Sequence, residues 1–217
     1  MKGLLIKDFR IIFSQKRFFL LLIFIAVMLN FNSSGSFVIG YLTFVCSVFT
    51  LNTISYDENE NGYSFLMTLP FLRKMYALEK YVFGLLISSG AWVISVILAF
   101  VYEVYSKHSF VMPDFFINAA IFIPLFVVLI SIMLPFQFKF GSEKGRIAMV
   151  MAFGIVFFAV YFTVKAFEKV GIDVEKIIDN LSVMHQSMLL LIAFIVSVLL
   201  LVSSIAVSVH IIKNKEF

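Results

Sequence analysis

Six long apolar stretches alternate with short polar segments along the chain. A helix needs about 20 apolar residues to cross a bilayer core of about 30 Å. Only helices and closed barrels satisfy their backbone hydrogen bonds in lipid, and these stretches lack the alternation of barrel strands. We therefore predict an all-α membrane protein with six transmembrane helices, at Phe18–Phe31, Ser36–Ser55, Tyr81–Tyr105, Phe115–Phe138, Ile147–Val164 and Ser187–Ile212.

Two of these spans have irregular features. The first, Phe18–Phe31, reaches only about 21 Å as a helix. Either the helix continues through residues 32–35, or the bilayer thins around it. In the fourth span, Pro124 and Pro135 predict kinks, or a break near residue 135.

The basic residues indicate how the spans are oriented. Six spans place both chain ends on the same side of the membrane. If the N-terminus is cytoplasmic, thirteen of the 17 Lys and Arg residues fall in the inner segments and four in the outer ones. Because inner segments carry the excess of positive charge, we predict a multi-pass protein with both termini in the cytoplasm.

Composition supports a membrane protein and excludes several other classes. Hydrophobic residues make up 62% of the chain and charged residues 14%. A soluble domain is about 45–50% apolar and about 25% charged, so a soluble enzyme and a disordered chain are both excluded. The single cysteine, Cys46, excludes a disulfide scaffold. The net charge of +4 is scattered between apolar spans, which does not indicate binding to nucleic acid.

The first 17 residues have the pattern of an amphipathic helix. Its apolar face is formed by Leu5, Phe9, Ile12 and Phe13, and its other side by Lys7, Arg10, Ser14 and Arg17. An apolar stripe opposite basic residues is typical of a helix that lies in the headgroup plane. We predict an interfacial helix over residues 1–17. The alternative is a plain basic anchor for the first span.

The connection between the second and third spans, residues 56–80, carries an unusual apolar patch. Acidic residues open it, Gly62 provides a turn, Pro70 interrupts any helix, and a basic pair begins at Arg73. The patch between them consists of Tyr63, Phe65, Leu66 and Leu69. An apolar patch rimmed by charges suggests a docking surface for a partner. The alternative is that the patch lies on the lipid interface.

Polar residues inside the spans allow two interpretations. Thr43, Ser47 and Thr50 share one face of the second span and could line a substrate path. The alternative is helix packing, in which small hydroxyl side chains allow close approach. Packing is also the prediction for the sixth span, where Ser197, Ser204 and Ser208 fall roughly on one side. No acidic or basic residue lies near the middle of a span, which disfavours an ion-coupled carrier.

The sequence contains no recognisable catalytic or cofactor motif. The string nearest to a phosphate-binding P-loop, residues 141–146, has the wrong spacing and composition. The three histidines are isolated, so no set of zinc ligands is present, and there is no nucleophile-elbow motif. We therefore predict that the chain is not an enzyme and holds no metal or cofactor of its own.

The segment from Asp57 to Lys80 resembles the corresponding loop of small ABC-2 type exporter permeases. More narrowly, it is similar to permease subunits of the staphylococcal phenol-soluble modulin exporter and of related peptide-export and self-immunity systems. The residues that carry the resemblance are the acids, Gly62, Leu66, Leu69-Pro70, Arg73 and Lys80-Tyr81. The pair Lys7-Asp8 ahead of the first span and the six-span layout also agree with it.

This resemblance implies a division of labour between subunits. A separate cytosolic ABC ATPase would bind ATP and magnesium, and two permease chains would pair as a homodimer or a heterodimer. The chain would be one transmembrane domain of a bacterial, Gram-positive plasma membrane, with residues 18–55 and 81–212 as spans and 213–217 as a cytoplasmic tail. Residues 1–17 would form the connecting helix.

The resemblance also implies a cytoplasmic coupling helix within residues 56–80. Its ATPase-docking residues would be Glu58, Glu60, Gly62, Tyr63, Phe65, Leu66, Leu69, Pro70 and Arg73. The implied cargo is an amphipathic or cytolytic peptide. The alternative function is that of a membrane immunity or scaffold protein that sequesters a toxin or a sensor without transporting anything.

Overall fold

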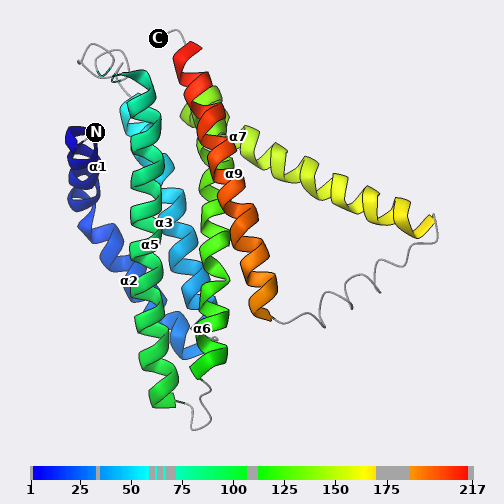
Figure 1. Ribbon diagram of the computed structural model, residues 1–217. Helices are drawn as coiled ribbons and strands as arrows, with labels where there is room; N and C mark the ends of the chain where they lie inside the picture. Colours follow the sequence, from blue (N-terminus) through cyan, green and yellow to red (C-terminus); the bar gives the residue numbers. More distant parts are fainter. Residues whose placement is uncertain are drawn as a thin grey trace.

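The apolar stretches form long helices in the computed structural model, which describes residues 2–32, 35–58, 62, 66, 72–106, 112–169 and 186–214. Figure 1 shows the arrangement, and no strand occurs within these ranges. The helices are α1 (Lys2–Ser14), α2 (Lys16–Asn32), α3 (Gly35–Glu58), α5 (Arg73–Ser106), α6 (Met112–Ala120), α7 (Phe122–Lys169) and α9 (Gln186–Asn214). For this part of the chain, the prediction of an all-α fold is confirmed.

Four helical segments are long and apolar enough to cross a membrane. They are Gly35–Glu58, Arg73–Tyr105, Met112–Gly141 and Gln186–Asn214, and they contain the second, third, fourth and sixth predicted spans. The first predicted span lies on α2. This helix is long and apolar enough to cross a membrane only when it is joined with α1, from which it is bent by 65°. The fifth lies on the second half of α7, which is not among these candidates. The count of six spans therefore stays a prediction.

The centre of the bundle is α3, which packs against α5 and α7, while α9 packs on α7. Hydrogen bonds from serine and tyrosine hydroxyl groups join α5, α7 and α9. Tyr81 on α5 hydrogen-bonds with Ser204 and Ser208 on α9, at 2.5 and 2.8 Å. Ser204 in turn donates to the Ser131 carbonyl on α7, at 2.5 Å. Ser197, Ser204 and Ser208 are all buried, so the predicted packing role of this face is confirmed.

The helix α7 changes direction at Gly141 and not at Pro135. The backbone stays helical through Pro135, whereas Gly141 has φ 78° and ψ −179°. Only glycine adopts this conformation without strain. Gly145 then packs so closely on the helix before the bend that an added Cβ would lie 3.0 Å from Gln137 Oε1. After this bend the second half of α7 projects away from the bundle (Figure 1).

Replacing Gly141 tests how much the bend depends on glycine. We expect Gly141→Ala to lower the free energy of unfolding by about 1–3 kcal/mol, because alanine is strained at this backbone conformation. The measurement is the thermal unfolding midpoint of the purified protein in detergent. Gly90→Ala is the matched control, since a Cβ at this helical position meets nothing within 4 Å. Equal shifts of the unfolding midpoint in the two variants would contradict the conclusion that the bend requires glycine at position 141.

Candidate functional site

Several helix ends meet at one end of the bundle. The helix α1, the last turn of α3, the first turns of α5 and the end of α9 all lie there (Figure 1). The Arg73 guanidinium donates to the Lys213 carbonyl at 3.3 Å, which joins the start of α5 to the end of α9. We call this region the loop end, because the segment that connects α3 to α5 leaves from it.

A fully buried lysine lies at the loop end. Lys80, on α5, has 0% of its side chain exposed. Its ammonium donates to Asp8 Oδ2 on α1 at 2.5 Å and lies 2.9 Å from Asp57 Oδ2 on α3. It also donates to Thr53 Oγ1 at 3.2 Å. Since an unpaired buried ammonium is strongly unfavourable, these oxygens are what allow a lysine at this position.

The same two aspartates bind a second lysine. Lys7, on α1, donates to Asp57 Oδ1, and its ammonium lies 3.2 Å from Asp8 Oδ1. The Tyr76 hydroxyl donates to Asp57 Oδ2 at 2.9 Å. We call Lys7, Asp8, Asp57 and Lys80 the charge cluster. Its two cations and two anions come from α1, α3 and α5, so ion pairs join three helices at one point.

Apolar contacts beside the charge cluster also fix α1 on the bundle. The rings of Phe9 and Phe83 pack edge to face, with centroids 5.5 Å apart. Leu4 is buried in the same apolar cluster as Leu66. Phe9 belongs to the expected apolar face, but the buried face of α1 is centred on Leu4 and Asp8, while Phe13 of the expected face is exposed. Residues 2–14 are helical, but α1 ends at Ser14, short of the predicted residue 17, and its place in the headgroup plane stays a prediction.

One acidic residue in the sequence is a signal for the charge cluster. Asp8 is the single acid among the first 17 residues, within a segment of five basic ones. An acid on the face that turns toward the protein indicates a buried cationic partner. Lys80, at the start of the third span, was the matching candidate.

The described part of the predicted docking segment folds back on the loop end. A Cβ at Gly62 would lie 2.7 Å from the Asp57 carbonyl, and Leu66 is only 8% exposed. The Glu58 carboxylate faces the bend at Gly141, and Arg73 is exposed at the start of α5. The docking role of these residues stays a prediction. Five further predicted docking residues lie outside the described part of the chain: Glu60, Tyr63, Phe65, Leu69 and Pro70.

The polar face of α3 lies against α5. Ser47 hydrogen-bonds with Ser88 at 2.9 Å and donates to the Thr43 carbonyl at 2.7 Å, while Thr43 donates to the Ile39 carbonyl. A Cβ at Gly84 would lie 3.1 Å from Thr50 Cγ2. In this conformation the three hydroxyl side chains serve helix packing, and their part in a substrate path stays a prediction.

These features define a multi-helix membrane protein whose loop end is held together by buried ion pairs. Comparison with known families gives the particular class. The model of the ABC-2 family transporter protein matches residues 3–213, which is nearly the whole chain. The chain therefore belongs to the ABC-2 transporter family, whose members form the membrane part of ABC transporters and work with an ABC ATPase. No curated protein and no solved structure matches the chain.

Removing one partner of the buried pair tests its energetic role. We expect Asp8→Asn to lower the free energy of unfolding by about 3 kcal/mol, because it leaves Lys80 buried with one carboxylate fewer. Replacing both partners, as in Asp8→Leu with Lys80→Met, removes one charge of each sign, leaves Lys7 paired with Asp57, and is expected to restore most of the stability. Chemical unfolding of the purified variants measures both effects.

The control for this series is Asp114→Asn, the same chemical change at an exposed position in the first turn of α6. Its expected cost is less than about 1 kcal/mol, the usual contribution of an acid at a helix N-terminus. If Asp8→Asn were no more destabilising than Asp114→Asn, the charge cluster would not hold α1 in place.

Proposed function

We propose that this chain is the permease subunit of an ATP-driven exporter, powered by a separate cytosolic ATPase. The match to the ABC-2 family over residues 3–213 carries this proposal. The excess of Lys and Arg in the predicted inner segments supports a cytoplasmic loop end, on the side where ATP is available. ATP and magnesium would be bound by the partner subunit.

The proposed docking site is the segment between α3 and α5. Arg73 and Leu72 are exposed at its end, whereas Leu66 is buried and would anchor the segment to the bundle. A push by the ATPase on this segment would act directly on the last turn of α3 and the first turn of α5. Because Asp57 and Lys80 are both paired with α1, the three helices would move together rather than the loop alone.

The proposed cargo is an amphipathic or cytolytic peptide of the phenol-soluble modulin kind, and two permease chains would form the path. The similarity of residues 57–81 to permeases of such exporters supports this choice. The composition agrees with it, since 28 Phe residues and few charges suit a cargo with one apolar face.

Transport by the reconstituted complex tests this function. The chain is co-purified with candidate ABC ATPases from the same organism, and the complex is placed in inverted vesicles. We expect uptake of a fluorescent amphipathic helical peptide that requires ATP, together with ATP hydrolysis above that of the ATPase alone. Peptide binding without uptake, unaffected by ATP, would contradict the proposal and favour the immunity or scaffold function.

The charge cluster is expected to set the efficiency of coupling. In complexes that remain assembled, Asp8→Asn should lower the peptide transported per ATP hydrolysed by a factor of about 2 to 30, the range that 0.5–2 kcal/mol of coupling gives. ATP hydrolysis itself should continue. The control is again Asp114→Asn. An unchanged ratio in Asp8→Asn would show that α1 takes no part in coupling.

A further inference from the structure

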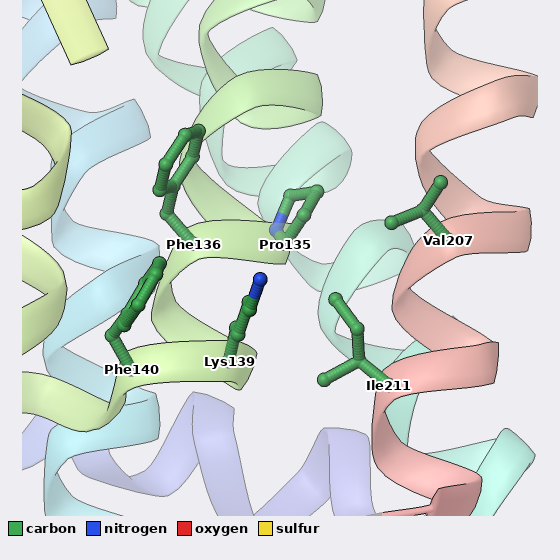
Figure 2. Close-up of a pocket in the computed structure, with 6 residues that line it drawn as sticks. All are labelled: Pro135, Phe136, Lys139, Phe140, Val207 and Ile211. Carbon is green, nitrogen blue, oxygen red and sulfur yellow. The ribbon is translucent and has the colours of Figure 1, made fainter.

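A groove runs between α7 and α9. Its wider part has a volume of about 510 Å³ and is lined by Pro135, Phe136, Lys139, Phe140, Val207 and Ile211. Figure 2 shows Val207 and Ile211 pointing from α9 toward α7, and the Lys139 side chain running along α7 with its ammonium directed toward Pro135. Apart from this ammonium, the lining side chains are apolar.

The groove continues toward the middle of the bundle. A second hollow of about 260 Å³ shares Pro135, Phe136 and Val207 with the first and extends to Leu200 and Ser203. From Ile211 to Leu200, α9 rises about 16 Å. This length is close to half of a bilayer core of about 30 Å, which is the depth of the acyl chains of one leaflet.

The ammonium of Lys139 distinguishes this groove from an ordinary apolar face. Lys7 and Lys80 are paired with aspartates, whereas no ion pair of Lys139 occurs among the described side chains. The Lys139 ammonium lies over the Phe140 ring, 5.3 Å from the ring centroid. The site therefore presents one positive charge at the polar end of an apolar channel.

We propose that this groove binds one anionic phospholipid. The lipid phosphate would lie at Lys139, and one acyl chain would follow Pro135, Val207 and Leu200 toward the bilayer centre. Charge complementarity favours this occupant, since basic pockets between transmembrane helices bind anionic headgroups. A helix of this chain or of a second copy would have to bring its own acid to Lys139, whereas the lipid supplies the anion and the apolar chain together. The site depends neither on the cargo nor on the ATPase.

Native mass spectrometry of the purified full chain tests this proposal, with phosphatidylglycerol and phosphatidylcholine added separately. We expect one phosphatidylglycerol to remain bound and phosphatidylcholine to be lost. Lys139→Gln should weaken phosphatidylglycerol binding about fivefold, the effect of one basic residue at an anionic headgroup. Lys144→Gln, at an exposed position beyond the bend, is the matched control and should leave binding unchanged. Inorganic phosphate should not compete, because it lacks the acyl chain.

A second pair of variants tests the apolar part of the groove. Val207→Trp fills the channel and should lower phosphatidylglycerol binding, whereas Val202→Trp, on an exposed face of α9 that does not line the groove, should not. Equal binding of the two lipids, or equal effects of the two lysine variants, would overturn the proposal. Disulfide formation in phosphatidylglycerol bilayers, in a Cys46→Ala background, tests other occupants of the groove. A disulfide between Val207→Cys and Phe158→Cys of one chain would place the second half of α7 there, and one between the Val207→Cys positions of two chains would place a second copy there. Either result would overturn the proposal.

Discussion

The loop end is organised by the need to neutralise one lysine that water does not reach. Lys80 is fully buried, and its two carboxylate partners come from helices that are 23 and 72 residues away in the sequence. Removing either partner would leave a buried charge with incomplete pairing, which is far more unfavourable than the pair itself is favourable. The positions of α1, α3 and α5 are therefore interdependent at this end.

The rest of the bundle is held by contacts of another kind. Between α5, α7 and α9, small hydroxyl side chains and the Tyr81 hydroxyl form a chain of hydrogen bonds that allows close packing. Such hydrogen bonds contribute only about 1 kcal/mol each in a membrane, and packed helices can shift past one another by small amounts. An ionic loop end combined with hydroxyl-packed spans suits a protein that receives a push at one end and passes it along its helices. The bend at Gly141 lies beside Glu58, so the second half of α7 also begins at the loop end.

Hydropathy was sufficient to predict the helical class and the positions of four candidate spans, because transfer of a segment into lipid depends on that segment alone. The charge cluster was not predicted, because it depends on which residues meet across long sequence distances. The apolar pattern of α1 placed Lys7 on the polar side, yet the ion pairs with Asp57 turn this side toward the bundle. Pro135 suggested a break, but the helix continues through it and bends at Gly141. The sequence around Gly141 resembles a phosphate-binding loop only poorly, and nothing in its local pattern indicated a bend. Leu66 was assigned to an exposed patch, and its burial follows from tertiary contacts that no local pattern contains.

The central claim is that the ATPase acts on the loop end, and cross-linking along α5 tests it most directly. Two exposed positions mark the ends of this helix: Leu72, 58% exposed, directly precedes it, and Tyr105, 86% exposed, lies in its last turn. Each is replaced by cysteine in a Cys46→Ala background, and the complex with the ATPase is treated with a short bifunctional thiol reagent. We predict a cross-link to the ATPase from position 72 and none from position 105. A cross-link from position 105 alone would place the ATPase at the opposite end and contradict the account.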